Sequence, residues 1–322
     1  MSTISYTVVD AFTSLPFQGN PAAVVILPSD HKFPDSTLQN IAAEFKLSET
    51  AFITAPTSAE ILTGSEPSAS FKLRWFTPVL EVPLCGHATL ASAKVLFSNP
   101  NYVPPNIDII RFSTLSGVLT ARRIVGDKVE LEFPAGESEQ ADDSLAQRVI
   151  ELVQKSVGDS PLVNEVHVGL GPTFKRWVIV NLVKEFDLET AQVDASVFVG
   201  SSFAWGISHT NKLSFQNHLK DTPIYGVLLT STRVSSLKSD TAFISRAFVP
   251  RSGVAEDPVT GAAHCLLTPY WSRVLSIPGG QVIPTRQVSP RGGNIDLVWK
   301  QNTGTVLLWG ESRVVAKGEV YC

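Results

Sequence analysis

A weak internal repeat is the feature that most limits how this chain can fold. Residues 81–88 align with residues 256–263, so that Glu81 meets Glu256, Gly86 meets Gly261 and Ala88 meets Ala263. Each copy follows a strand pattern that ends in an aromatic residue and a proline, and each precedes a helix pattern. The repeat predicts one β-rich unit wrapped round a helix, present twice.

The duplication also predicts where a ligand binds. The two helices would begin near Gly86 and Gly261, and the start of a helix presents free N–H groups and a partial positive charge. If both starts face one cleft between the halves, that cleft suits a small carboxylate. The expected ligand is therefore a small-molecule carboxylate substrate.

Composition excludes several other classes of function. The chain has 322 residues and a formal net charge of -4, with 26 Lys+Arg against 30 Asp+Glu. The absence of a basic block argues against nucleic acid as a partner, and the apolar runs are too short for a membrane span. The first ten residues are typical of a strand and not of an export signal. Three widely spaced cysteines indicate a reducing, cytoplasmic location without a disulfide framework.

Strand patterns dominate, and helices are fewer. Alternating apolar residues predict strands over much of the chain, with turns at Gly19-Asn20-Pro21 and Ser116-Gly117. Four stretches have helical spacing or follow a glycine with small apolar residues. These stretches are Asp35 to Leu47, His87 to Phe97, Ser144 to Val157 and Ala262 to Leu275, and Pro269 fits poorly inside the last.

Three side chains are candidates for chemistry, each with a structural alternative. Glu49 lies at a helix-to-strand junction and either points into the cleft or is a solvated loop residue. His87 either polarises a ligand at a helix start or is a satisfied, partly buried histidine. Asp257 either orients a base or caps the following turn. His264 and Cys265 are expected to pack in the core.

Motifs for other chemistries are missing from the sequence. No P-loop, complete dinucleotide fingerprint or G-x-S-x-G elbow occurs. The remaining histidines show no metal-ligand spacing. We therefore expect no cofactor, no metal and no acyl-enzyme serine. The histidines without such spacing are His31, His167, His209 and His218.

Over nearly its whole length the sequence resembles the phenazine-biosynthesis PhzF-like isomerases, which have the diaminopimelate epimerase-like fold. Short strings in a fixed order and spacing carry this resemblance. In the first half they are Val9-Asp10-Ala11-Phe12, Phe17 to Val24, Leu47 to Phe52, Arg74 to Pro78 and Cys85-Gly86-His87-Ala88-Thr89. In the second half they are Glu256 to Gly261, Ala263-His264-Cys265, Pro269-Tyr270-Trp271 and Ser289-Pro290-Arg291-Gly292-Gly293.

The resemblance implies an α+β fold of two similar domains, each a β-barrel-like sheet around a central helix, with the active site between them. We place the domains at 1–125 and 126–322, with the last strand free to return to the first domain. The family's enzymes need no cofactor and are typically homodimers. Their prototype isomerises trans-2,3-dihydro-3-hydroxyanthranilate by moving a proton along a conjugated ring, in secondary metabolism.

Site residues are implied one by one. The family's acid/base glutamate matches Glu49, and its active-site histidine and aspartate match His87 and Asp257. The resemblance also places Asn20, Gly86 and Gly261 at the substrate. The family serine that would hydrogen-bond the substrate carboxylate falls on Ala262, which keeps the backbone N–H and loses the hydroxyl. That departure puts the prototype's own substrate in doubt.

Two rival functions stay open. Racemases of this fold use two cysteines, and here Cys85 precedes Gly86 whereas Thr260 precedes Gly261. This pattern disfavours a two-thiol racemase and leaves a one-thiol racemase or dehydratase. The second rival is a small-carboxylate binding protein that lost catalysis, which Ala262 alone favours. We predict a cofactor-independent isomerase acting on a small unsaturated or cyclic carboxylic acid.

Overall fold

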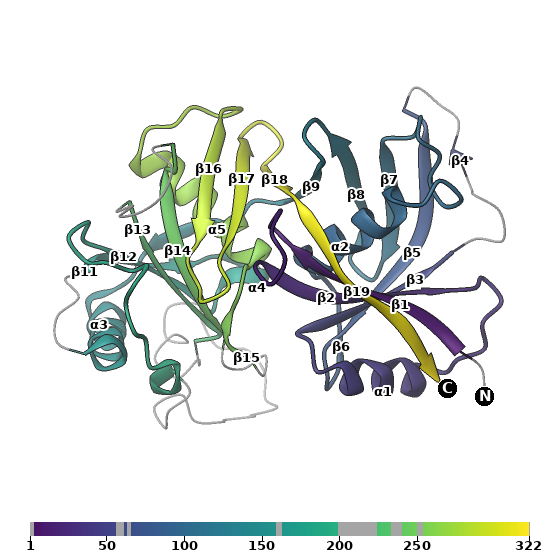
Figure 1. Ribbon diagram of the computed structural model, residues 1–322. Helices are drawn as coiled ribbons and strands as arrows, with labels where there is room; N and C mark the ends of the chain where they lie inside the picture. Colours follow the sequence, from purple (N-terminus) through teal and green to yellow (C-terminus); the bar gives the residue numbers. More distant parts are fainter. Residues whose placement is uncertain are drawn as a thin grey trace, which may run out of the picture.

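The computed structural model describes residues 3–55, 61–62, 66–158, 163–198, 224–232, 240–249 and 254–321. The histidines His209 and His218 and the third of the three cysteines, Cys322, lie outside these ranges. Figure 1 shows two lobes side by side, with a helix inside each and the two chain ends close together. None of the helices in the described ranges has the length and apolar character needed to cross a membrane.

The lobe on the right of Figure 1 is built by a ladder of paired strands that we call the first ladder. Its order is β19-β1-β2-β3-β5-β7-β8-β9, with the short strands β4 and β6 also paired to β5. Its strands are β1 (Thr3–Ala11), β2 (Asn20–Leu27), β3 (Glu49–Thr54), β4 (Ile61–Leu62), β5 (Ser68–Phe76), β6 (Glu81–Val82), β7 (Ile109–Thr114), β8 (Gly117–Ile124), β9 (Lys128–Pro134) and β19 (Ser312–Tyr321).

The left lobe is built by the second ladder, in the order β10-β11-β12-β13-β14-β16-β17-β18, with β15 paired to β14. Its strands are β10 (Ser138–Gln140), β11 (Val163–Gly169), β12 (Trp177–Leu182), β13 (Gly226–Ser231), β14 (Phe243–Val249), β15 (Val254–Asp257), β16 (Val282–Gln287), β17 (Gly293–Lys300) and β18 (Thr305–Gly310).

The two ladders repeat the same pairing pattern. In the first, β2 and β3 are parallel and so are β5 and β7, and the other neighbours are antiparallel. In the second, β12 and β13 are parallel and so are β14 and β16, and again the other neighbours are antiparallel. The repeat read from two short sequence segments therefore extends through the whole sheet.

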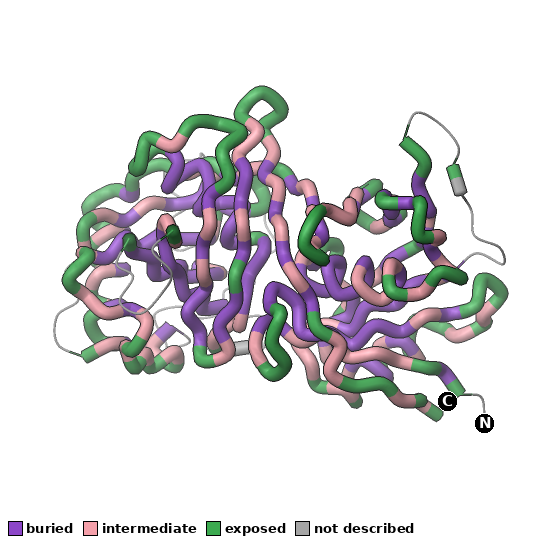
Figure 2. The backbone as a smooth tube through the Cα atoms, turned by 45° about the horizontal axis from the view of Figure 1, so that its top comes forward, coloured by how far each residue is buried: buried purple, intermediate pink, exposed green. Residues whose placement is uncertain are grey.

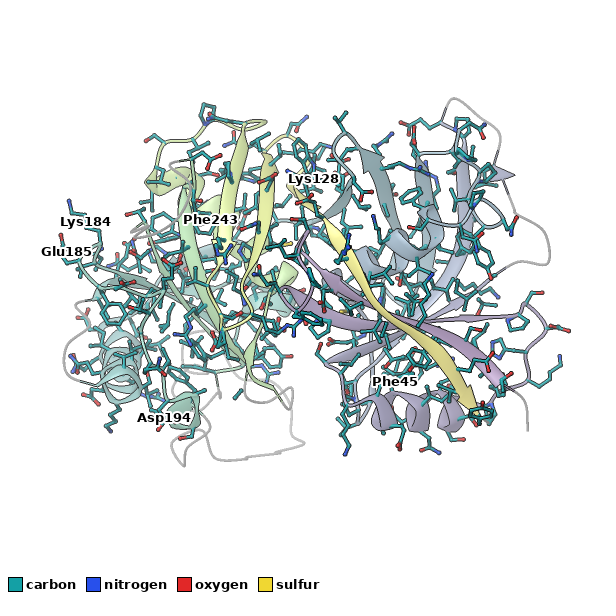
Figure 3. All side chains as sticks on the ribbon, in the orientation of Figure 1. Phe45, Lys128, Lys184, Glu185, Asp194 and Phe243 are labelled. Carbon is teal, nitrogen blue, oxygen red and sulfur yellow. The ribbon has the colours of Figure 1, made fainter. Side chains whose placement is uncertain are left out.

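The ladders are joined at two places. Strand β9 pairs with β18, and Lys128 of β9 forms an ion pair with Asp296 of β17 at 2.5 Å, near the top of Figure 3. The last strand, β19, leaves the second ladder and pairs with β1 along its length. Because β9 pairs on both sides, the sheet is continuous past residue 125, and the domain division at 125/126 remains a prediction.

Each lobe has one helix in its core. Helix α2 (Gly86–Phe97) contacts β1, β2, β3, β8 and β9, and α5 (Gly261–Val274) contacts β17 and β18. Most residues of both helices are buried, and Figure 2 shows buried residues throughout the interior of each lobe. The ring of Phe243, labelled in Figure 3, stacks on Trp271 of α5 with centroids 5.5 Å apart. His264 and Cys265 of α5 are buried, which confirms their expected place in the core.

Helix α5 accommodates Pro269 through a contact with a distant segment. Proline lacks an N–H, so the carbonyl of Cys265, four residues earlier, loses its helical donor. The backbone N–H of Gly136 donates to that carbonyl at 2.9 Å instead. A Cβ on Gly136 would lie 2.9 Å from Leu266 and Phe174, so a larger residue would require these side chains to shift. The expected conflict at Pro269 is thus resolved by the segment between β9 and β10.

The other helices lie outside the ladders. Helix α1 (Asp35–Phe45) connects β2 to β3, and α3 (Asp143–Val157) follows β10 and is capped by Asp142, whose side chain accepts from the Leu145 N–H at 2.8 Å. Two short segments, α4 (Gly171–Phe174) and the 3₁₀ turn η1 (Ala195–Phe198), complete the described helices. Helix α1 covers a small core of its own at the end of the first lobe.

Candidate active site

The starts of the two central helices meet. A Cβ placed on Gly86 would lie 3.6 Å from the Cα of Gly261, and one placed on Gly261 would lie 3.7 Å from the Cα of Gly86. Both helices begin at these glycines, so their unpaired N–H groups converge on one region between the lobes. This arrangement is the one that the repeat predicted.

Glu49 lies at this meeting point. It is the first residue of β3, after the chain leaves α1 through Lys46, whose backbone has a left-handed φ of 54°. The side chain is 18% exposed, and its Oε2 lies 3.3 Å from Nε2 of His87. Burial raises the pKa of Glu49, and hydrogen bonds from Ser48 and Cys85 partly oppose this rise. Its placement excludes the solvated-loop alternative.

His87 is the second residue of α2, and its ring is buried among polar partners. Nε2 lies 3.2 Å from Oγ of Ser48, and Nδ1 lies 3.5 Å from Sγ of Cys85. Burial lowers the pKa of His87 to about 4, against the opposing charge of Asp257. The ring is therefore neutral near pH 7, with one nitrogen able to donate and the other to accept.

Asn20 links the two lobes within the site. Its Nδ2 donates to Oδ1 of Asp257 at 2.8 Å and to the Val259 carbonyl at 2.9 Å, and it lies 3.3 Å from Nδ1 of His87. Asn20 begins β2 in the first ladder, whereas Asp257 ends β15 in the second. One amide side chain thus connects His87 and Asp257, two of the three groups expected to take part in chemistry.

Asp257 is held by several bonds at the start of α5. Thr260 Oγ1 donates to its Oδ2 at 2.5 Å, and Gln287 Nε2 donates to its backbone carbonyl, also at 2.5 Å. Burial raises the pKa of Asp257 to about 6, opposed by His87, by the Thr260 bond and by the Asn20 bond, while the charge of Glu49 raises it further. The capping and the chemical interpretations of Asp257 are therefore both compatible with its position.

All seven predicted site residues lie together. Glu49, His87, Asn20 and Asp257 form one chain of direct contacts, and Gly86 and Gly261 adjoin it. Ala262 is the second residue of α5 and is exposed, so its missing hydroxyl leaves open space beside the helix start. The geometry groups these residues, and their individual roles remain predictions.

Sequence reasoning missed the residues that brace this site. Gln287, the last residue of β16, accepts from the backbone N–H of Thr260 at 2.9 Å as well as bonding Asp257. Arg291 donates to the carbonyl of Gly19 and to Oδ1 of Asp10, both at 2.8 Å, which fixes the segment before Asn20. Arg291 lies in a string that carried the family resemblance, but nothing in that string indicated its partners.

One trio in the site has the composition of a metal centre. Glu49, Cys85 and His87 each offer one ligand atom, and these atoms lie within 4.8 Å of one another. Zinc accepts such mixed ligands. However, burial holds the pKa of the Cys85 thiol well above its ordinary value, and a zinc ligand must be a thiolate. Without a metal the thiol is therefore protonated, and the expected absence of a metal stays a prediction.

Comparisons with known proteins agree on one family. The sequence profile described as "Phenazine biosynthesis-like protein" matches residues 9–318. A mouse phenazine biosynthesis-like domain-containing protein is 36% identical, covering 97% of this chain and 96% of its own. An uncharacterized isomerase of Halalkalibacterium halodurans is 34% identical over 99% of both chains.

Solved structures support the fold. The crystal structure of a PhzF-family phenazine biosynthesis protein from Enterococcus faecalis superposes with a TM-score of 0.75 and 30% identity, covering 100% of both chains. A hydroxyproline epimerase from Agrobacterium vitis has a TM-score of 0.56 at 11% identity, covering 99% of this chain and 92% of that one, and shares the fold alone. The predicted α+β class is confirmed, and the chain belongs to the phenazine biosynthesis-like (PhzF) protein family.

Proposed function

We propose that this protein is a cofactor-independent isomerase that moves a proton between carbons of a small unsaturated or cyclic carboxylic acid. The observation that carries the proposal is the position of Glu49. Its carboxyl group is largely buried at the meeting point of two helix starts, beside a neutral histidine, and burial raises its pKa. A base of this kind, tuned toward the working pH, is what proton transfer from carbon requires.

The chemistry balances with one carboxyl group. Ionised Glu49 removes a proton from an sp³ carbon next to a double bond, and the electron pair of the broken C–H bond spreads over the unsaturated system and the carboxylate. The same carboxyl group then returns its proton to a different carbon on the same face. The double bond shifts, and Glu49 ends ionised as it began. Such positioned acid/base catalysis contributes roughly 10²–10⁴-fold.

The surrounding groups fit supporting roles. Backbone N–H groups at Gly86, Gly261 and Ala262 suit the substrate carboxylate and the negative charge that develops on it. His87 would present a neutral ring beside the reacting carbons, and Asn20 would hold His87 and Asp257 in register. Their placement on two ladders makes the site depend on both lobes.

The test is hydrogen exchange at carbon. Purified protein is incubated with a panel of unsaturated and cyclic carboxylates in deuterated water, and C–H exchange is followed by NMR. We expect exchange in at least one acid, and a loss of roughly 10²–10⁴-fold in Glu49→Gln. Exchange that persists in this variant removes Glu49 from its role. A metal chelator should leave the wild-type rate unchanged, because the proposed chemistry needs no cofactor.

A second candidate deserves a matched test because of Cys85. Its thiol lies in the same trio as Glu49 and His87, as a one-thiol racemase or dehydratase would require. The raised pKa of this thiol counts against it as a base.

A binding protein without catalysis would instead bind an acid tightly with no exchange in any ligand. The expected homodimer and cytoplasmic location remain predictions, and sedimentation measures the first.

A further inference from the structure

The equivalence of the two ladders identifies what replaces the acid/base corner in the second lobe. Thr50 pairs with Phe76 on β5, and Val227 pairs with Phe248 on β14. Phe76 and Phe248 are equivalent, because the arginine two residues before each makes the same bidentate bond to the glutamate of the repeat. Counting back from these pairs, Gly226 corresponds to Glu49, and Tyr225 corresponds to Ser48.

At Gly226 the second lobe has no room for a carboxyl group equivalent to that of Glu49. A Cβ on Gly226 would lie 2.6 Å from the ring of Trp177, so a side chain at this position would displace the tryptophan. Trp177 pairs with Gly226 across β12 and β13 and is itself buried. Tyr225, the residue before Gly226, provides a polar side chain next to this position instead.

Tyr225 occupies the place in the second ladder that Ser48 occupies in the first. Its ring packs against Trp177 with centroids 5.4 Å apart, and it is only partly buried. Burial raises the pKa of Tyr225, the charges of Glu49 and Asp257 raise it further, and the charge of Arg176 opposes this rise. In the first lobe the equivalent Ser48 contacts His87, and the residue equivalent to His87 is the small Ala262.

Arg176 adds a positive charge to this corner. Its guanidinium carbon lies 5.8 Å from the centre of the Tyr225 ring, and its carbonyl accepts from the Tyr225 N–H at 2.7 Å. Among the described residues no carboxylate forms an ion pair with it, unlike Arg74 and Arg246, which each bind a glutamate. A partly buried guanidinium without an acid, beside a phenol that can donate, is a binding environment for an anion.

We propose that Arg176 and Tyr225 form a second anion subsite, so that the substrate carries two anionic groups, one at the helix starts and one at this corner. This inference rests on the proposed function and narrows its substrate class to unsaturated diacids. Glu49 would act on the carbons between the two anchored ends. The shared ligand chemistry is an anion with oxygen acceptors, which a second carboxylate or a phosphate supplies.

Matched ligand pairs test the subsite by binding. Fumarate and crotonate differ in one carboxylate against a methyl group, and so do muconate and sorbate over a longer chain. Dissociation constants are measured by calorimetry for the wild type, Arg176→Gln and Tyr225→Phe. In the wild type we expect the diacid of at least one pair to bind more tightly. Arg176→Gln should weaken that diacid about tenfold, and Tyr225→Phe about threefold, with the monoacid unchanged within about twofold.

The controls separate this proposal from the proposed function. The same titrations in the Glu49→Gln background measure binding without proton transfer, so they stand even if no ligand exchanges. Arg273→Gln is the matched control, because Arg273 also stacks on an aromatic ring, at 5.9 Å from Trp299, but is exposed on α5. Phosphoenolpyruvate replaces fumarate in a further arm, and stronger Arg176 dependence there assigns the subsite to phosphate. The proposal is overturned if no pair shows a preference for the diacid that depends on Arg176, or if Arg273→Gln has the same effect.

Discussion

The two ladders share a framework to the level of single side chains. Arg74 binds Glu81 through two hydrogen bonds of 2.7 and 2.8 Å, and Arg246 binds Glu256 through two of 2.7 Å. Each arginine also lies over the phenylalanine two residues later, at 5.0 Å for Phe76 and 5.4 Å for Phe248. The glutamates that align in the internal repeat are thus the ones that tie β6 to β5 and β15 to β14.

The ladders differ where the helices start. The first has Cys85, His87 and Glu49 at this point, whereas the second has Thr260, Ala262 and Gly226 in the equivalent places. The groups suited to acid/base work therefore belong to one lobe, and the other supplies Asp257 and the opposite wall. This difference favours a one-base reaction, in which a proton leaves and returns on the same face, over a two-base racemisation.

The largest expected change in the free energy of unfolding comes from breaking one of the two arginine–glutamate pairs. Arg246 and Glu256 have side chains that are 7% and 14% exposed, against 33% and 23% for Arg74 and Glu81. Glu256→Gln leaves a buried guanidinium without its counter-charge and should lower the free energy of unfolding by about 3 kcal/mol. Urea unfolding near pH 7 measures the change.

The matched variant Glu81→Gln should cost no more than about 1 kcal/mol, because Arg74 is more exposed and keeps Asp35 at 2.7 Å. If Glu256→Gln and Glu81→Gln lose the same free energy of unfolding, the burial of each pair does not determine how much it stabilises its lobe.

The strands of the two ladders and the residues of the candidate site could be predicted from the sequence to different extents. Alternation located most long strands, but β16 was missed because Pro284 lies inside it, although the carbonyl of Pro284 accepts from Ala242 at 2.8 Å. Strand β11 was missed because polar residues interrupt its apolar ones. Alternation reports which side chains are buried on one face of a sheet, so strands interrupted by a proline or by polar residues escape it.

The site was predicted through the family resemblance and the glycines, not through local pattern. Asn20 and Asp257 are 237 positions apart, and nothing in either neighbourhood indicates their 2.8 Å contact. Gln287 and the Arg176–Tyr225 pair were missed for the same reason. Their positions follow from strand register, which the sequence of one strand does not contain.

The next prediction concerns how the free energy of unfolding depends on pH, because Asp257 in the second lobe and His87 in the first have pKa values shifted in opposite directions. The pKa of Asp257 is raised to about 6, so its stabilising contribution is present below its ordinary pKa and is lost as pH rises through about 6. The pKa of His87 is lowered to about 4, so its contribution is present above its ordinary pKa and is lost as pH falls toward 4. The two slopes oppose each other between pH 4.5 and 6.5, and because burial also lowers the pKa of His264 to about 4, they are measured as differences from the wild type.

Removing either group should leave the pH dependence contributed by the other. In Asp257→Asn, stability should rise by about 2 kcal/mol from pH 4.5 to 6.5 relative to the wild type, since the His87 contribution remains. In His87→Gln it should fall by about 2 kcal/mol over the same interval. Urea unfolding at the two pH values gives both slopes, and parallel pH profiles for the three proteins would contradict the assignment.

A smaller effect is expected at the residues that precede the two glycines. Cys85→Ala removes a buried thiol and should cost about 1 kcal/mol of stability while carbon exchange stays within about tenfold of the wild type. Thr260→Ala removes the hydrogen bond that lowers the pKa of Asp257, which should then rise above about 6. Assays of carbon exchange in Cys85→Ala and Thr260→Ala, with Cys85→Ser as the control, measure how much each residue contributes to the rate. A loss above about 100-fold in Cys85→Ala and Cys85→Ser alike would favour the one-thiol alternative.

The smallest effect concerns the position at which this chain departs from its family. Ala262→Ser adds a hydroxyl to an exposed residue in the first turn of α5, next to the N–H groups proposed to hold the carboxylate. One added hydrogen bond to a carboxylate contributes about 0.5–1.5 kcal/mol, which corresponds to at most about tenfold tighter binding of crotonate. Stability should stay within about 0.5 kcal/mol, because nothing buried changes. Calorimetry measures the affinity, and Ala255→Ser, an exposed substitution on β15, is the control. Weaker binding in Ala262→Ser would mean that the open space beside Ala262 is itself occupied by the ligand, and the carboxylate would then have to be placed deeper between the two helices.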